Sequence, residues 1–268
     1  MKKERKLGKV YHDKWGKTQM MCSHKRLALY VPETRRLSAV SLREMLQRYG
    51  MVYVKPCFGS LGRGVMKVER LQDAKKIRYA YQLGEKRFVF NSFRELTASL
   101  RKVIRGESYL VQQGIHVLKR AGRPFDIRLM VQLNERGRWE VTGVIGRVAH
   151  PRKIVTNGSQ GGTIYTVDQL LKGSAPSWKQ SKAVTKMNRV GMVASKVLKR
   201  SLPKLWEVGL DLAVDGELKP WILEANTRPD PCPFTKIADR SMLQRIVRLG
   251  RLHGRVYDLR CTKARRGR

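Results

Sequence analysis

The sequence has few acidic residues for its length. Among its 268 residues, 21 are Asp or Glu and 57 are Lys or Arg, so the formal net charge is +36. This excess is larger than solubility requires, and such a surface attracts polyanions over long range. The composition therefore predicts a polyanionic partner. The sign of the charge does not distinguish among nucleic acid, acidic protein or peptide, anionic polymer and membrane headgroups, and part of the charge also serves solubility.

Cysteine and histidine are scarce and scattered. The four cysteines form no CxxC pair, and the five histidines show no metal-ligand spacing. Both patterns argue against a structural zinc site, and the cysteines also argue against a disulfide framework. No nucleophile-elbow pattern is present, although a Ser-His-Asp or Cys-His assembly built by the fold stays open.

Long hydrophobic runs are absent. No apolar stretch approaches the length needed to cross a membrane. The basic start, MKKERKLGKV, is not followed by the hydrophobic core of a signal peptide. The expected location is therefore the cytoplasm. A hydrophobic fraction of 41% still supports a core, and the length suits one large domain or two small ones.

Two helices are predicted before the first strand. Asp13 can cap a helix that runs to about Leu29, and Ser38 or Ser41 begins a second helix that Gly50 ends. The predicted buried stripe of this second helix is Val40, Leu42, Met45 and Leu46.

The remaining pattern alternates strand hairpins with helices, which predicts an α+β or mixed α/β fold in two lobes. Strands are expected at 51–56, 65–71, 87–91, 108–115, 125–133, 139–148, 208–214 and 219–224. Helices are expected at 92–104, 179–202 and 241–253. Short basic tails close both ends of the chain.

The stretch GLDLAVDGELKPWILEANTRPD carries the strongest chemical signal. Its Asp-Gly link predicts a hairpin turn, so Asp211 at the start of one strand faces Glu224 and Asn226 at the end of the next. Side chains two residues apart on a strand share a face. Three hard oxygen ligands at one end of a sheet are typical of a magnesium site. The alternative is that these acidic residues are simply solvated.

A second candidate is the glycine loop between two expected strands. Gly59, Ser60, Gly62 and Gly64 leave backbone N–H groups free to approach phosphate, and Lys55 precedes them. The loop is not a Walker sequence, and a strand follows it where a Rossmann turn needs a helix. It is either a hairpin flap over a nucleotide or an ordinary glycine-bearing hairpin.

These segments together resemble a known family. MVYVKPCFGSLGRGVMKV resembles the phosphate-binding hairpin of the ATP-grasp superfamily. PFDIRLMVQL with VIGRVAH, VTNGSQGG, and GLDLAVDGELKPWILEANTRP resemble its later motifs, in the same order and spacing. With DKW and LYVPETRRLS, the sequence is most similar to the YheC/YheD-like, endospore-coat-associated branch. The resemblance covers about residues 10–255.

The resemblance implies an ATP-grasp fold of two α+β lobes that clasp a nucleotide. It assigns residues 1–12 to a basic N-terminal tail, 13–111 to an N-terminal lobe with its preceding helices, 112–258 to a C-terminal lobe and 259–268 to a basic C-terminal tail. Relatives usually carry a further N-terminal domain that helps to bind the carboxylate substrate, so we expect that domain to be missing or supplied by a partner.

The resemblance also implies roles for individual residues. Arg128 and Arg147 would be catalytic and stabilise phosphoryl charge, although in a chain so rich in arginine both also fit surface charge. The magnesium ligands would be Asp211, Glu224 and Asn226. The ATP-binding residues would be Lys14, Lys55, Gly59, Ser60, Gly62, Gly64, Val111, Gln112, Gln113 and Ile115. The substrate side would be lined by Asn157, Gly161 and Gly162, with Arg228 and Asp230 where this chain departs from its relatives.

The implied activity is an ATP- and Mg²⁺-dependent carboxylate–amine ligase that forms an amide through an acylphosphate. The basic surface suits an acidic peptide, protein or polymer as the substrate, with an amino acid or another amine as co-substrate. Two alternatives belong to other classes. One is a nucleic-acid or polyanion-binding protein that has kept a grasp-like fold, and the other is a structural spore-coat protein, with a spore-associated location.

Overall fold

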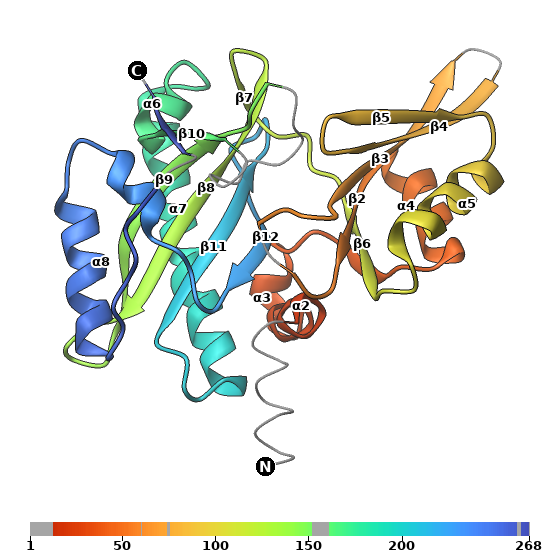
Figure 1. Ribbon diagram of the computed structural model, residues 1–268. Helices are drawn as coiled ribbons and strands as arrows, with labels where there is room; N and C mark the ends of the chain where they lie inside the picture. The colour runs from red at the N-terminus through yellow and green to blue at the C-terminus, as the bar shows by residue number, and fades with distance from the viewer. Residues whose placement is uncertain (1–12, 60, 74–75, 152–160, 262–263, 268) are drawn as a thin grey trace. The chain divides into compact units, whose positions relative to one another are not determined.

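A computed structural model describes residues 13–59, 61–73, 76–151, 161–261 and 264–267. The chain divides into two compact units (Figure 1). Among the described residues, the larger unit takes 13–31, 116–150, 161–261 and 264–267, and the smaller takes 32–59, 61–73, 76–115 and residue 151. In these described ranges, no helix is both long and apolar enough to span a membrane.

The smaller unit is a six-stranded sheet covered by two helices. Its strand order is β1-β6-β2-β3-β4-β5. The strands are β1 (Thr34–Arg36), β2 (Met51–Pro56), β3 (Met66–Asp73), β4 (Lys76–Leu83), β5 (Lys86–Phe90) and β6 (Tyr109–Gln113). The helices are α4 (Ala39–Tyr49) and α5 (Phe93–Ile104), and both contribute to the core of this unit.

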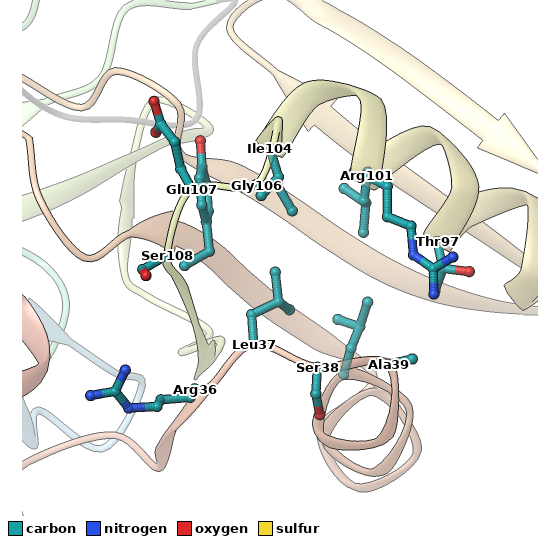
Figure 2. Close-up of a pocket in the computed structure, with 13 residues that line it drawn as sticks. Arg36, Leu37, Ser38, Ala39, Thr97, Arg101, Ile104, Gly106, Glu107 and Ser108 are labelled. Carbon is teal, nitrogen blue, oxygen red and sulfur yellow. The ribbon is translucent and has the colours of Figure 1, made fainter.

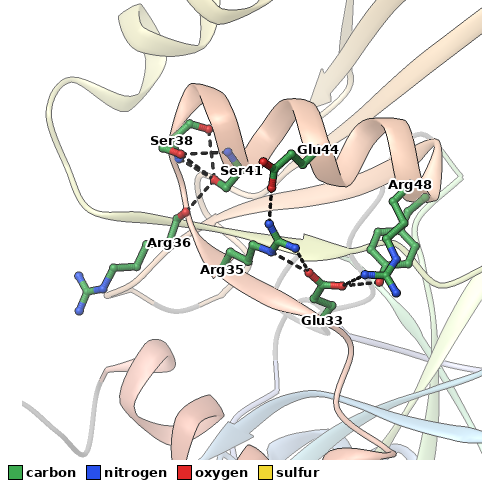
Figure 3. Close-up of polar contacts among 8 residues, drawn as sticks. Glu33, Arg35, Arg36, Ser38, Ser41, Glu44 and Arg48 are labelled. Atoms are coloured by element: carbon green, nitrogen blue, oxygen red, sulfur yellow. Dashed lines mark hydrogen bonds and ion pairs between the residues drawn. The ribbon is translucent and has the colours of Figure 1, made fainter.

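Helix α4 begins and ends where its sequence predicts. Ser38 and Ser41 form a reciprocal capping box, which selects Ser38 as the cap, and Gly50 ends the helix with φ of 69°. Figure 3 shows these contacts beside Arg35, which pairs with both Glu33 and Glu44 and so ties α4 to β1. The predicted buried stripe is wrong at Val40, which is 67% exposed.

The larger unit contains a second sheet with strand order β12-β11-β8-β9-β10-β13, and β7 pairs with β8. Its strands are β7 (Lys119–Arg120), β8 (Arg123–Leu133), β9 (Trp139–Val148), β10 (Thr163–Tyr165), β11 (Glu207–Val214), β12 (Pro220–Asn226) and β13 (Arg265–Arg266). Its helical elements are α2 (Lys14–Cys22), α3 (Lys25–Ala28), α6 (Val167–Leu171), α7 (Ser177–Ser201), α8 (Ser241–Leu252) and the 3-10 turn η2 (Cys232–Lys236).

Two helices of the larger unit cover opposite faces of this sheet. Leu129 of β8 lies in one core cluster with the buried side of α7, whereas Met130 lies in another with Ile246 of α8. Because successive strand residues point to opposite faces, α7 and α8 pack on different sides. Figure 1 shows α7 passing behind the strands and α8 at the left, beside β9.

Several elements differ from the sequence expectation. The first helix is interrupted at Ser23 and His24, where His24 caps the short α3. Helices α2 and α3 pack against α7 and group with the larger unit, whereas the expected division put them with the N-terminal lobe. Strand β4 was not predicted, although it pairs with β3 along its full length. Arg265–Arg266, expected in a tail, pair with β10.

The hairpin β11–β12 has the predicted register but not the predicted turn. Asp211 lies opposite Glu224, which confirms the expected pairing. The turn is longer than a two-residue Asp-Gly turn: residues 215–219 form a loop, and Leu218 rather than Gly216 adopts positive φ. The Asp215 carboxylate accepts hydrogen bonds from the backbone N–H groups of Glu217 and Lys219, so the aspartate organises the loop.

We predict that Gly209→Ala destabilises the larger unit by about 1–3 kcal/mol. A Cβ at Gly209 would lie 2.5 Å from Cβ of Pro229, so the segment after β12 would have to move. The control is Gly216→Ala in the same hairpin, where nothing lies within 4 Å of the added Cβ. Urea unfolding midpoints compare the two variants, and equal midpoints would contradict the packing argument.

Candidate active site

Four charged side chains lie in register across neighbouring strands of the larger unit. Asp126 of β8 pairs in register with Arg147 of β9, and Arg128 of β8 pairs with Asp211 of β11. Their strand neighbours with apolar side chains, among them Ile127, belong to the α7-side core. Alternation therefore projects all four from the opposite face, the face that α8 covers in part.

A β-bulge completes this face. The β11–β12 register shifts between Asp211 and Leu212, so that Asp211 lies opposite Glu224 while Leu212 lies opposite Ile222. In a regular strand Ile222 and Glu224 would share a face. Because the bulge adds one residue, Ile222 enters the α7-side core, while Glu224 lies opposite Asp211. The bulge thus allows Ile222 to face the core while Glu224, two residues later, faces the site.

The centre of the site is a buried network of two arginines and two aspartates. Arg128 Nε donates to Asp211 Oδ1 at 2.6 Å, and Nη2 donates to Oδ2 at 3.3 Å. Arg147 donates to both oxygens of Asp126, and its Nη2 lies 3.0 Å from Asp211 Oδ1. All four side chains are buried. Such charges are tolerated in a core because each has a partner of opposite sign.

These contacts set the ionisation of the network. Burial raises the pKa of Asp211, but the charges of Arg128 and Arg147 outweigh it and lower that pKa to about 2. Burial also opposes the charge on Arg147, yet Asp126 and Asp211 raise its pKa. The site therefore holds fixed guanidinium charge in a low-dielectric setting, where it interacts most strongly with a developing anion.

The three predicted magnesium ligands lie together at the end of the β11–β12 hairpin. Asn226 Nδ2 lies 3.4 Å from Asp211 Oδ2, and Lys14 Nζ lies 3.5 Å from Glu224 Oε1. Two carboxylates and one carboxamide form a donor set that fits Mg²⁺ by its chemistry. The described residues contain no group of three or more His, Cys, Asp or Glu side chains that could hold a metal ion, so a site here depends on the amide of Asn226. Asp211 must then serve the ion and two arginines together.

The sequence argument missed Lys17. This residue is 5% exposed, and within the described ranges no hydrogen bond or ion pair reaches its Nζ. Burial lowers its pKa to about 8, opposed in part by Glu224. A signal was present: Lys17 follows Lys14 by three residues on α2, so both lie on one helix face. α2 thus presents two buried lysines beside the site carboxylates.

The predicted residues of the smaller unit also group together. Lys55 Nζ donates to Gln112 Oε1 at 2.8 Å, and Gln112 Nε2 donates to Thr34 Oγ1 at 2.9 Å. The N–H of Gln113 donates to the carbonyl of Glu33 at 2.8 Å. Val111 lies inside the sheet between β1 and β2, and Ile115 is buried just beyond β6.

The glycine loop of the smaller unit contains several residues with left-handed backbone conformation. Gly59, Gly62 and Gly64 all have positive φ, and so does Leu61. Gly64 has a second constraint, because an added Cβ would lie 2.8 Å from the Tyr109 hydroxyl. Ser60 lies outside the described residues.

The predicted substrate residues are more dispersed. Asn157 lies outside the described residues. Gly161 has φ of 84°, and the carbonyl of Gly162 accepts a hydrogen bond from the N–H of Arg265. Arg228 and Asp230 are exposed, and Asp230 Oδ1 accepts from the N–H of Cys232 at the start of η2.

A pocket of about 520 Å³ in the smaller unit contains none of the predicted residues. Figure 2 shows it between the start of α4 and the end of α5, with Ser38, Arg101 and Ile104 among its lining residues. Its mixed lining carries no cluster of catalytic groups, so the charged network of the larger unit remains the candidate site.

We predict that Lys17→Met raises the free energy of unfolding by roughly 3 kcal/mol at pH 7. The folded pKa of about 8 lies below the ordinary value of 10.5, so the folded state binds this proton less tightly than the unfolded chain. The protonated Lys17 therefore destabilises the folded wild-type protein. This destabilisation is complete below pH 8 and disappears as the pH rises to 10.5. Urea unfolding of both proteins across this pH range measures the difference between their free energies of unfolding. A difference that does not change with pH would contradict the lowered pKa of Lys17.

Comparisons with known proteins identify the family of this chain. The family model described as YheC/D like ATP-grasp matches residues 4–249. The endospore coat-associated protein YheD of Bacillus subtilis (strain 168) is 27% identical over 232 residues, covering 85% of this chain and 50% of YheD. YheC of the same organism is 26% identical over 226 residues, covering 83% and 61%. The chain thus spans about half to three-fifths of the length of these curated relatives.

Solved structures share the fold at low sequence identity. D-cycloserine synthetase DcsG has a TM-score of 0.56 and 14% identity, covering 91% of this chain and 71% of that one. The D-alanine-D-alanine ligase from Coxiella burnetii has a TM-score of 0.52 and 13% identity, covering 91% and 59%. The predicted α+β ATP-grasp fold is confirmed.

Proposed function

The chain belongs to the YheC/D-like ATP-grasp family, and from that premise we propose that it is an ATP- and Mg²⁺-dependent ligase that joins a carboxylate to an amine. The observation that carries the proposal is the buried face of the larger unit, where Arg128, Arg147 and Asp211 form one network beside Glu224. Fixed charges of both signs at one strand end suit the transfer of a phosphoryl group.

The proposed reaction has two steps. A substrate carboxylate oxygen attacks the γ-phosphorus of ATP, the bond to the β–γ bridging oxygen breaks, and ADP leaves. The amine nitrogen then attacks the acyl carbon of the acylphosphate, phosphate leaves with the bonding electrons, and the nitrogen loses a proton. Neither step requires a covalent enzyme nucleophile, so positioning and charge supply most of the rate.

Each group of the larger unit has a role in this scheme. Arg128 and Arg147 stabilise negative charge on the transferred phosphoryl group and on the acylphosphate. Asp211, Glu224 and Asn226 hold Mg²⁺, which polarises phosphoryl oxygens when bound. Lys14 and Lys17 of α2 add positive charge beside Glu224.

The smaller unit contributes nucleotide contacts in this proposal. Lys55 and the Gly59–Gly64 loop bind phosphate oxygens, the loop through its backbone N–H groups. The hydrogen bond from Lys55 to Gln112 restrains the buried lysine. The segment from Val111 to Ile115 contacts the adenine.

An acidic peptide or protein is the proposed carboxylate substrate, with an amino acid or another amine as the second substrate. The support is the net charge of +36, which favours encounter with an anionic chain. Asn157, Gly161 and Gly162 line the acceptor side, and Arg228 and Asp230 select among acceptors. The names of the two curated relatives associate those proteins with the endospore coat, and we extend that association to this chain.

We predict that Glu224→Gln loses more activity than the ~10–100-fold typical of a residue that only supports a metal ligand. Removing one carboxylate charge weakens the hold on Mg²⁺. The measurement is ADP release with ATP, Mg²⁺, an acidic peptide and an amino-acid mixture, together with Mg²⁺-dependent binding of a fluorescent ATP analogue. Glu217→Gln, on the exposed loop of the same hairpin, is the control. Full turnover by Glu224→Gln would refute the metal assignment.

Lys55→Met tests the nucleotide contacts of the smaller unit separately. We expect ATP binding to weaken at least ~10-fold, because a charge-assisted contact to phosphate is lost. AMP binding should change much less, since AMP lacks the β- and γ-phosphates. Lys67→Met in the adjacent strand is the matched control, since Lys67 pairs with Glu69. Equal loss for ATP and AMP would contradict a phosphate-specific role for Lys55.

A further inference from the structure

Helix α7 carries an unusual charge distribution. Its 25 residues, SWKQSKAVTKMNRVGMVASKVLKRS, include seven Lys or Arg and no Asp or Glu. Six of the basic residues are exposed and recur at helical spacing, and we call them the α7 row: Lys179, Lys182, Lys186, Arg189, Lys196 and Arg200. Steps of three, four and seven residues keep the row on one side of the helix. From first to last it spans roughly 31 Å.

The row is not neutralised within the part of the chain that the structure describes. No ion pair involves any of its members there. Lys179 and Lys186 lie near aromatic rings instead, 5.4 Å from the centroid of Trp178 and 5.9 Å from that of Tyr30. Like charges on one helix face destabilise a helix by repulsion, so the row has a cost that a bound polyanion would remove.

A groove runs beside the start of the row. It has a volume of about 620 Å³ and is lined by the first four row residues together with Trp178 and the β11–β12 loop. Trp178 is 61% exposed, an uncommon position for a large aromatic ring. Glu217 of the loop is the acidic residue among the lining residues. The groove therefore combines four positive charges and one accessible ring with one negative charge.

The row also lies apart from the catalytic face. The inward side of α7, including Met187 and Val190, packs on the sheet face opposite to Arg128 and Asp211. The row is directed away from that sheet. A chain bound along it therefore occupies a different surface from the substrates of the proposed ligase.

We propose that the α7 row and Trp178 form a binding surface for single-stranded nucleic acid. A cationic track beside an exposed aromatic ring is the arrangement by which proteins bind single strands without sequence preference: phosphates follow the charges and a base stacks on the ring. An acidic peptide would use the same charges, but its Asp and Glu side chains have no flat face to stack on Trp178. The ring is the observation that favours nucleic acid.

The test is binding of the full chain to a fluorescein-labelled, mixed-sequence single-stranded DNA of roughly 20 nucleotides, followed by anisotropy over a range of salt concentrations. We expect the triple variant Lys182→Gln/Lys186→Gln/Arg189→Gln to bind at least ~10-fold more weakly. Its plot of log K against log salt should be less steep by about two, because each lost phosphate contact removes about 0.7. The control removes three charges elsewhere, as Arg94→Gln/Lys102→Gln/Arg251→Gln, and should change affinity less than ~3-fold.

A second variant separates nucleic acid from acidic peptide. Trp178→Ala should weaken DNA binding at least ~5-fold through lost stacking, while leaving binding of labelled polyglutamate unchanged. Equal losses in the two triple variants would overturn the proposal in favour of diffuse charge attraction. If Trp178→Ala leaves the affinity for DNA unchanged and polyglutamate binds as tightly as DNA, the proposal is overturned in favour of an acidic peptide. ADP release should be unchanged in every variant, so this outcome is independent of the proposed ligase activity.

Discussion

The double pairing of Asp211 with Arg128 and Arg147 is the interaction on which the candidate site depends. Four buried charges at the end of a sheet are unfavourable unless each one has a partner. Asp211 bridges the two arginines, and Asp126 completes the charge balance on Arg147. Removal of any one side chain would leave the positive and negative charges of the network unequal in number, so the network constrains three adjacent strands as well as the chemistry they support.

The strand order β9-β8-β11-β12 makes this network possible. It brings together residues from three separate sequence segments, and the bulge after Asp211 adds Glu224 from a fourth strand. The same alternation that projects the charges from one face directs Ile127, Leu210 and Leu212 into the core beneath α7. Core packing and site geometry are therefore two consequences of one register, and a slip of one residue would destroy both.

The positive charge of the chain has at least two distinct settings. Lys14, Lys17, Arg128 and Arg147 are buried beside carboxylates, where their charge acts over a few ångströms. The α7 row is exposed and has no acidic partner among the described residues, so its charge acts on molecules in solution. The total charge predicts a polyanionic partner, but it does not separate the buried charges from the exposed ones. The burial and packing of each side chain make that distinction.

The sequence by itself indicated the ATP-grasp fold through its resemblance to the family, and it supplied candidate site residues, because motif order, strand alternation and hairpin pairing can be read along the chain. Asp211 opposite Glu224 follows from two strands joined by a short loop. The tertiary structure decided which charges meet. Lys17 became a site residue only through burial against the larger unit, and Asp211 gained two arginine partners from β8 and β9. The packing of α7 on the sheet likewise determined that the α7 row lies on the exposed side of this helix. Contacts between distant segments depend on packing, and no local pattern encodes them.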